Sequence, residues 1–351
     1  MKILGINLFH YDTSASLIID EKIIVGAEEE RFKRIKHYSG FPTMSIQYCL
    51  DSQNLELGEI DYISVNYNKN HNFSEKIKYS LENFYNINIY KKFCKNILKR
   101  PLQKIIENNL KQKFNGKIHF VPHHTAHIAS SFYISGFEKA IGLSIDGTGD
   151  FSSMEIFRCE KNKIILKEKV NFPHSIGFLY QAVTQLLGFT EYGDEYKIMG
   201  MSAFGQPKYL SKFNELLEFD PPYNFTLNQK FFKLDNLYEP IQSKKNKKNS
   251  ILYSDKMVEL FEMSSLKNQK DEQKIFNIAS SLQKFIEIYI IKIIKNLHLE
   301  YDVKNLCLSG GVIFNSLLNG KISKEFSKTC IHVGSNSGDA GGSLGAALFT
   351  A

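Results

Sequence analysis

The stretch AIGLSIDGTGDFSSMEIFRC, residues 140–159, joins two apolar runs through a short segment rich in glycine. This pattern predicts a strand over Ala140 to Ile145, a turn over Asp146 to Asp150 and a second strand over Ser153 to Arg158. A further apolar run over Lys163 to Val170 predicts a third strand, which would form a hairpin with the second. The unit is therefore a strand, a glycine-rich turn and a hairpin.

The same order of elements occurs at the start of the chain. An apolar run over Ile3 to Leu8 predicts a strand, and Tyr11 to Ser14 form a small polar turn. Two more strands are expected over Ala15 to Ile19 and Ile23 to Ala27. Two copies of one unit predict a duplicated α/β fold. Actin, the sugar kinases and Hsp70 are built in this way (the ASKHA fold), with a nucleotide in the cleft between two lobes.

The predicted lobes divide the chain near its middle. We expect a first lobe over residues 1–139, with a helical insertion around residues 70–115, and a second lobe over residues 140–351. A segment around residues 222–255 lacks periodicity and is interpreted as an excursion of loops. Apolar residues at helical spacing over Asp271 to Leu299 predict one long helix packed on the core.

Composition favours a globular protein without membrane spans. The 351 residues are 43% hydrophobic and 13% aromatic, which is sufficient for the cores of two lobes. No segment has the pattern of a signal peptide or a spanning helix, so a cytoplasmic location is expected. The cysteines lie far apart without a CxxC pair, which argues against a zinc ribbon or a disulfide framework and favours reduced thiols. They are Cys49, Cys94, Cys159, Cys307 and Cys330.

Lysine runs account for much of the net charge of +7. Runs of this kind, at Lys91 to Arg100 and at Lys244 to Lys248, can bind nucleic acid or other anionic surfaces. No recognisable nucleic-acid module accompanies them, so an ordinary solvated face is the favoured interpretation. Nucleic acid is therefore not expected to be the main partner.

Histidines gather in VPHHTAHIAS, residues 121–130, directly after a run that predicts a strand. If a helix begins there, His123 and His127 project from one face, which is the spacing that two imidazoles need to share a metal ion. Capping or packing would explain them equally well from spacing alone. Asp146 and Asp339 are candidate oxygen ligands, and such a set would suit Fe²⁺, Mn²⁺ or Zn²⁺.

The turn DGTGD also has a candidate role in binding an anion. Gly147 and Gly149 would let backbone N–H groups approach a phosphate, because neither residue carries a side chain. An ordinary hairpin turn is the alternative interpretation of the same residues.

Taken together, eight segments resemble the O-carbamoyltransferase family of nodulation, cephalosporin and aminoglycoside biosynthesis. In order, they are FHYDTSAS, EEERFKRIKHYSGFP, HHTAHIASSF, LSIDGTGD, SIGFLYQAVTQLLGF, YGDEYKIMGMSAFG, CLSGGVIFNSLLNGKI and GDAGGSLGAAL. They extend over nearly the whole chain, and their order is more specific than any single segment. The N-terminal domain of that family resembles the tRNA threonylcarbamoyl transferase, with the duplicated fold inferred above.

The resemblance implies roles for particular residues. The metal ligands would be His123, His127, Asp146 and Asp339, holding a divalent ion, by preference Fe²⁺, against the phosphates of ATP or carbamoyl adenylate. The nucleotide pocket would be lined by Gly147, Gly149, Lys197, Gly310, Gly311, Asn315 and Gly341, although Lys197 could equally be structural.

Three further residues would be catalytic by the same resemblance. His10 would be the general base, with Asp12 two residues later in the same motif, and Lys36 would stabilise developing negative charge. The alternatives are a hydrogen-bonded core histidine for His10 and an exposed surface lysine for Lys36.

The implied reaction moves a carbamoyl group from carbamoyl adenylate, made from carbamoyl phosphate and ATP, to a hydroxyl of a sugar or natural product. Family members usually continue into a YrdC-like domain that makes this adenylate, and the sequence given ends before such a domain. We therefore expect the chain to carry the transfer half of the reaction and to need a YrdC-like partner domain or protein. The alternatives are threonylcarbamoyl transfer to tRNA and a non-catalytic nucleotide-binding scaffold subunit.

Overall fold

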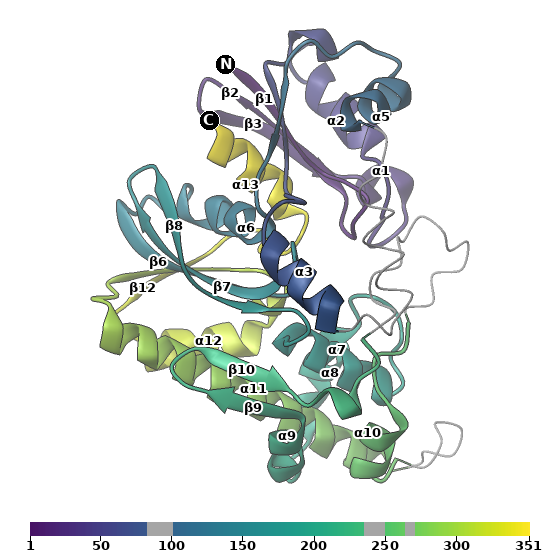
Figure 1. Ribbon diagram of the computed structural model, residues 1–351, viewed down its shortest axis with the longest axis vertical. Helices are drawn as coiled ribbons and strands as arrows, with labels where there is room; N and C mark the ends of the chain where they lie inside the picture. Colours follow the sequence, from purple (N-terminus) through teal and green to yellow (C-terminus); the bar gives the residue numbers. More distant parts are fainter. Residues whose placement is uncertain (83–100, 235–249, 264–270) are drawn as a thin grey trace.

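The computed structural model describes residues 1–82, 101–234, 250–263 and 271–351, and within them the chain forms two five-stranded sheets (Figure 1). The first sheet has the order β3 (Lys22–Glu28), β2 (Ser14–Ile19), β1 (Lys2–Asn7), β4 (Tyr62–Val65) and β5 (Lys117–Phe120). The second has the order β8 (Lys163–Asn171), β7 (Ser152–Glu160), β6 (Lys139–Gly149), β11 (Asn305–Ser309) and β12 (Cys330–Val333).

The two sheets repeat one topology. In each, three consecutive strands pair in antiparallel fashion and two later strands are added in parallel beside the first. The predicted strands of both units are present, so the duplicated ASKHA fold is confirmed. The division of the chain at residues 139 and 140 stays a prediction.

Apolar faces of the first sheet are covered by helices on both sides, which is why β1 is almost wholly buried. One side is covered by α2 (Thr43–Asp51) and by α5 (Leu102–Leu110), whose Ile106 is fully buried. The other side is covered by the last helix, α13 (Gly341–Thr350). The end of the chain thus lies against its beginning.

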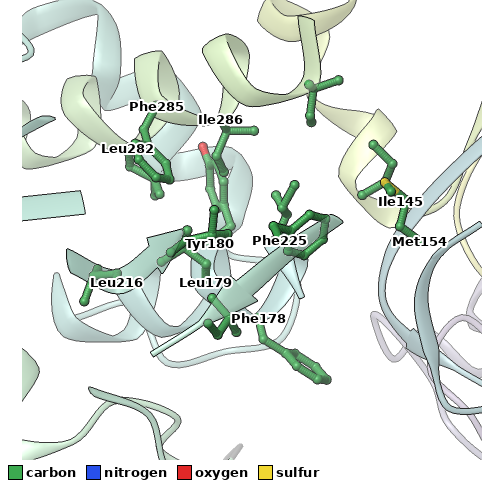
Figure 2. Close-up of a cluster of buried hydrophobic side chains, with 14 of the residues drawn as sticks. Ile145, Met154, Phe178, Leu179, Tyr180, Leu216, Phe225, Leu282, Phe285 and Ile286 are labelled. Atoms are coloured by element: carbon green, nitrogen blue, oxygen red, sulfur yellow. The ribbon is translucent and has the colours of Figure 1, made fainter. Parts of the chain in front are cut away.

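Helices of the second half cover the second sheet. The long helix predicted over Asp271 to Leu299 is confirmed as α11 (Glu272–Glu300), and it packs with α7 (Ile176–Leu186). Figure 2 shows this core, in which Phe285 and Ile286 of α11 lie near Leu179 and Tyr180 of α7. Besides α6, which is described next, the remaining described α-helices are α1 (Glu30–Lys33), α3 (Phe73–Glu82), α8 (Glu195–Met201), α9 (Leu210–Leu216), α10 (Asp255–Leu260) and α12 (Ser316–Glu325).

Between the two sheets, α6 (His123–Phe132) packs against α13 (Figure 1). Helix α6 covers β6 and β11 of the second sheet, whereas α13 covers β1, β2 and β4 of the first. The two helices come so close that a Cβ atom on Gly345 would lie 1.8 Å from the carbonyl oxygen of Ala126. This pair of helices therefore joins the two halves of the molecule.

The predicted turn over Asp146 to Asp150 is wrong as to where the chain reverses. Strand β6 continues to Gly149 with a register shift after Ile145, and the reversal falls at Asp150 and Phe151, both with positive φ. The glycines leave this stretch extended beside β7 instead of bending it, because an irregular strand can absorb the shift in register.

The predicted excursion of loops around residues 222–255 is also partly wrong. Strand β10 (Asn224–Leu227) pairs with β9 (Leu217–Asp220), and Phe225 and Leu227 are buried. Their alternation spans only four residues, too few for a period to stand out in the sequence. Residues 235–249 lie outside the described part, as does the lysine run at Lys244 to Lys248.

Helices α3 and α5 lie within the segment around residues 70–115 where the sequence predicts helical structure, and its assignment as an insertion in the first lobe stays a prediction. Residues 83–100, with the first lysine run and Cys94, lie outside the described part. The other four cysteines are free thiols. Among the described helices, none combines the length and the apolar character needed to cross a bilayer.

The close contact of α6 with α13 predicts a large effect of one methyl group. Gly345→Ala should lower the free energy of unfolding by about 1–3 kcal/mol, because backbone atoms of α6 cannot move away from the added Cβ. Gly320→Ala in α12, where a Cβ would meet open space, is the matched control and should raise the stability by about 0.5–1 kcal/mol. Urea denaturation measures both changes in stability. Equal effects of the two substitutions would contradict the close contact between α6 and α13.

Candidate metal centre

Helix α6 begins at His123 because Pro122 and the carboxylate of Asp150 fix its first turn. Pro122 precedes it with φ −55°, and the helix is buried along its whole length. The carboxylate of Asp150 accepts the N–H of His123 at 2.8 Å and the N–H of Asn68 at 2.8 Å. A carboxylate at a helix N-terminus satisfies a free donor and opposes the positive end of the helix dipole. Asp150 therefore sets the position of the histidines, a role that the sequence did not reveal.

Hydrogen bonds between β2 and the start of α13 fix the position of Asp339. The hydroxyl of Ser14 donates to the carbonyl oxygen of Ala340 at 2.7 Å and contacts the hydroxyl of Ser343 at 2.9 Å. Ser16 contacts the same Ser343 hydroxyl at 2.9 Å. Buried hydroxyls of the first sheet thus anchor the residue that follows Asp339, although more than three hundred residues separate them along the chain.

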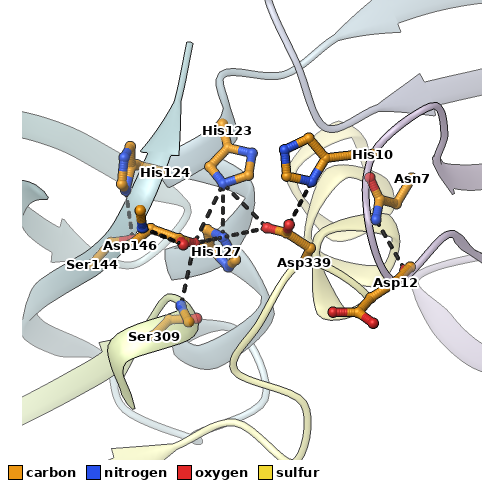
Figure 3. A network of polar contacts seen from close by, with 12 residues as sticks. Asn7, His10, Asp12, His123, His124, His127, Ser144, Asp146, Ser309 and Asp339 are labelled. Carbon is orange, nitrogen blue, oxygen red and sulfur yellow. Dashed lines mark hydrogen bonds and ion pairs between the residues drawn. The ribbon is translucent and has the colours of Figure 1, made fainter. Parts of the chain in front are cut away.

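The four predicted metal ligands, which come from α6, β6 and the turn before α13, converge in one place (Figure 3). The Nε2 atoms of His123 and His127 lie 3.0 Å apart, and that of His127 lies 3.0 Å from Oδ2 of Asp146. Oδ1 of Asp339 lies 3.4 Å from Nε2 of His123 and 3.5 Å from Nε2 of His127. The histidine pair, indicated by its spacing, and the two candidate carboxylates, distant in the sequence, therefore meet in one place.

These separations suit a shared ion. Ligand atoms about 2.1 Å from one metal lie about 3.0–3.4 Å from one another in octahedral or tetrahedral geometry. The set of two imidazoles and two carboxylates is typical of Fe²⁺, Mn²⁺ or Zn²⁺. Oδ1 of Asp339 is buried and has no hydrogen-bond partner, which is costly for a carboxylate unless a further ligand satisfies it. The residues therefore fit a divalent metal ion.

Electrostatics point the same way. Burial opposes ionisation of Asp146, but hydrogen bonds from His123 and His127 hold its pKa well below the usual range. Burial likewise opposes the charged form of His127, yet contacts with Asp146 and Asp339 raise its pKa to about 9. These contacts favour a protonated His127 beside ionised carboxylates, and binding of a metal ion there would require the loss of that proton.

The predicted phosphate glycines of β6 lie beside these ligands. A Cβ atom on Gly149 would fall 1.9 Å from Cδ2 of His123, so only glycine leaves room for that imidazole. The N–H of Gly147 donates to Oδ1 of Asp146 at 2.6 Å, and the N–H of Gly311 donates to its Oδ2 at 3.2 Å. In this structure these glycines orient two of the predicted metal ligands; their contact with a nucleotide stays a prediction.

The other predicted nucleotide residues line neighbouring turns. Gly310 has φ +98°, and its N–H donates to the carbonyl oxygen of Ser337 at 2.7 Å. Asn315 caps α12 by accepting the N–H of Leu318 and is also hydrogen-bonded to Gln283. Gly341 is the first residue of α13.

The two predicted lysines are placed differently. The Nζ of Lys197 lies 2.6 Å from Oδ1 of Asp194, one turn back in the chain, so the lysine has a structural partner. Lys36 is exposed and precedes His37. Neither belongs to the group of ligand atoms that converge in one place in the described part of the chain. Their roles stay predictions.

The two predicted catalytic residues of the first motif separate. Nδ1 of His10 lies 2.5 Å from Oδ2 of Asp339, so His10 joins the metal cluster from the side of the first sheet. Asp12 instead contacts His37, with 2.7 Å between Oδ1 and Nδ1. His37 was not singled out in the sequence, and its place beside Lys36 in RIKH is the signal that could have indicated it.

Removal of a ligand should abolish metal binding. We expect His127→Gln and Asp146→Asn to weaken Mn²⁺ binding at least about 100-fold, since each removes a donor atom at the centre. His124→Gln is the matched control, because His124 is buried on the same helix but bonds to Ser144 and to the carbonyl oxygen of Ser152. Metal content after anaerobic loading and dialysis measures the effect. Stoichiometric metal in all three variants would refute the site.

Comparisons with known proteins agree with the motifs. The family model described as carbamoyltransferase N-terminus matches residues 2–348. The nodulation protein NolNO of Sinorhizobium fredii is 30% identical over 98% of this chain and 46% of its own length. An uncharacterized protein of Synechocystis sp. is 32% identical over 99% of this chain and 56% of its own length. The chain thus spans about half the length of these curated relatives.

Among solved structures, component A of the (R)-2-hydroxyglutaryl-CoA dehydratase of Acidaminococcus fermentans is similar in fold. It superposes with a TM-score of 0.50 at 11% identity, covering 99% of this chain and 97% of its own. At this identity the likeness concerns the fold alone.

Proposed function

Because the chain belongs to the carbamoyltransferase family, whose N-terminal model covers residues 2–348, we propose that it transfers a carbamoyl group from carbamoyl adenylate to a hydroxyl group. The acceptor would be a sugar or another natural product, and the product an O-carbamoyl ester. The observation that carries this proposal is the convergence of His123, His127, Asp146 and Asp339 between the two sheets.

The chemistry explains why a metal site and a nucleotide loop are needed together. A carbamoyl carbon is a poor electrophile, and a phosphate leaving group makes its carbonyl carbon easier to attack. A divalent ion held by the four ligands would supply positive charge beside that phosphate. The protein's own residues must then hold the nucleotide, orient the acceptor and remove its proton.

The glycine loop before α12 is the proposed nucleotide contact. This loop lies directly against the predicted metal ligand Asp146, because a Cβ atom on Gly311 would lie 3.0 Å from Oδ1 of Asp146. Phosphates that touch the ion would therefore lie against this loop, with the start of α12 favouring negative charge. We assign Asn315, which is tied to Gln283 on α11, to hold the shape of the loop. Lys36 is the proposed external cation for charge that develops on the donor.

Nucleotide binding should depend on the metal. We expect calorimetry to detect ATP binding to protein refilled anaerobically with Fe²⁺, and at least about 10-fold weaker binding to metal-free protein, because a bound ion would supply positive charge to the phosphates. Asp339→Asn should behave as the metal-free protein does even after refilling. Asp20→Asn, which changes an exposed carboxylate on the first sheet, is the control and should bind as the unaltered chain does. Equal ATP binding with and without metal would instead favour a kinase-like site.

Transfer is tested directly with synthetic carbamoyl adenylate. Metal-loaded protein should release AMP faster than the solution reaction does, and mass spectrometry should find the carbamoyl group on a hydroxyl acceptor such as glucose or a chitin oligosaccharide. Transfer to tRNA would favour the threonylcarbamoyl alternative. Loss of any acceleration would contradict the proposed function.

A further inference from the structure

We propose that His37, oriented by Asp12, is the base that takes the proton from the acceptor hydroxyl. The inference rests on the proposed transferase function and adds to it the residue that activates the acceptor. It is carried by the geometry of the imidazole, by its backbone conformation and by its place beside the metal centre.

One carboxylate holds the His37 imidazole, and a second holds its backbone N–H group. The Nδ1–H group donates to Oδ1 of Asp12 at 2.7 Å, and the backbone N–H of His37 donates to Oε2 of Glu30 at 2.8 Å. When a carboxylate holds one ring nitrogen as a donor, the other nitrogen carries the free lone pair. The Nε2 atom of His37 is therefore the one that can accept a proton, and 37% of the side chain is exposed to solvent.

Both members of the pair adopt an unfavourable backbone conformation. Asp12 has φ +55° and His37 has φ +51°, in the left-handed region that residues with a side chain rarely occupy. The side chain of Asn7 holds the Asp12 backbone by donating to its carbonyl oxygen at 3.0 Å. Residues kept in such conformations by their surroundings are concentrated at functional sites.

The pair adjoins the metal centre through the loop after β1. His10 contacts the predicted ligand Asp339. Asp12 follows His10 by two residues, so the Cα atoms of His10 and Asp12 lie within about 7.6 Å of each other. Tyr192, from the second half of the chain, stacks on Tyr11 with 3.6 Å between ring centroids and meets His37 edge-on at 5.1 Å.

Tyr192 links the pair to the metal ligands. Burial raises the pKa of its phenol well above the usual value, and the charges of Asp339, Asp12 and Asp146 raise it further. The Tyr192 ring therefore lies within the electrostatic field of both the metal ligands and the Asp12–His37 pair. The next residue, Gly193, faces the imidazole so closely that a Cβ atom there would lie 2.4 Å from Nε2 of His37. The free nitrogen thus faces the junction between the two halves.

His10 is less suited to this task. Its Nδ1 lies 2.5 Å from Oδ2 of Asp339, so this nitrogen serves a predicted metal ligand. The arrangement makes His10 a positioning residue for Asp339, whereas His37 contacts no residue of the four-ligand cluster in the described structure.

The proposed step balances without a further reactant. Nε2 of His37 accepts the proton of the acceptor hydroxyl while the hydroxyl oxygen forms a bond to the carbamoyl carbon. The bond between that carbon and the phosphate oxygen then breaks, and AMP leaves with the electron pair. The imidazolium formed is stabilised by Asp12, and it returns its proton to solvent after the products leave.

The pH dependence follows from the groups that face His37. The hydrogen bond to Asp12 raises the pKa of His37 above its ordinary value, burial opposes this shift, and the charges of Asp12, Glu30 and Glu195 add to it. Tyr192 is the other titratable group against the ring. A base must be unprotonated, so the rate should rise with pH through this raised pKa. Asp12→Asn should move the rise to lower pH, because it removes the main cause of the shift.

Nuclear magnetic resonance of ¹⁵N-histidine-labelled, metal-free protein tests the pair without reference to activity. The His37 signal, assigned by its loss in His37→Gln, should show a proton on Nδ1 and a pKa above that of a model imidazole. Asp12→Asn should lower that pKa. A proton on Nε2, or a pKa that does not respond to Asp12→Asn, would overturn the assignment.

AMP release from carbamoyl adenylate, with water as the probe acceptor, then tests the role. We expect His37→Gln and His37→Asn to lower the limiting rate about 100-fold or more and to lose the rise with pH, with AMP affinity unchanged. His298→Gln is the matched control, since His298 stacks on Phe326 at the far end of α11, and it should leave the profile unchanged. His10→Gln should lose metal affinity but keep the rise with pH.

The outcomes separate the two proposals. If unaltered protein does not accelerate AMP release, the proposed function fails. If it does, and His37→Gln keeps the pH profile while His10→Gln loses it, the transferase function stands and the assignment of the base to His37 is overturned.

Discussion

The contact between α6 and α13 is the constraint on which the rest of the structure depends. Each helix covers a different sheet, and the two touch where Gly345 leaves no side chain against the backbone of Ala126. Because His123 opens α6 and Asp339 precedes α13, this contact also fixes the distance between two of the predicted metal ligands. The contact that packs the two sheets together therefore also assembles the candidate site.

The same region brings the carboxylates of Asp146 and Asp339 close together. Two carboxylates within a few ångströms would repel each other, and the raised pKa of His127, which contacts both, compensates by favouring a positive charge between them. A divalent ion could replace that positive charge without moving the ligands, since the nitrogen and oxygen atoms already stand at suitable separations. Asp150 and the glycines of β6 support this arrangement from outside, by fixing the start of α6 and leaving room for an imidazole.

Much of this architecture could be predicted from the sequence because its determinants are local. The apolar runs and turns in residues 3–27 and 140–170 predict both hairpin units, and the spacing of His123 and His127 predicts a shared face of one helix. The partnership with Asp146 and Asp339 depended on a resemblance across the whole chain. Such long-range contacts have no local period, and only the fold brings the residues together.

The features that the sequence did not reveal are of the same long-range kind. Asp150 reaches back to the N–H of His123, and Asp12 meets His37 across twenty-five residues. The glycines of DGTGD looked like a turn, but they serve an extended strand beside a metal ligand. Residue type indicated the chemistry in these cases, whereas the tertiary contacts decided which residue performs it.

A crystal structure of protein loaded anaerobically with Mn²⁺, with anomalous scattering measured to locate the ion, tests the central claim most directly. The account predicts one peak about 2.0–2.3 Å from donor atoms of His123, His127, Asp146 and Asp339, with α6 and α13 in contact as described. A peak held by other residues, or side chains of these four bonded to one another with no ion between them, would contradict it.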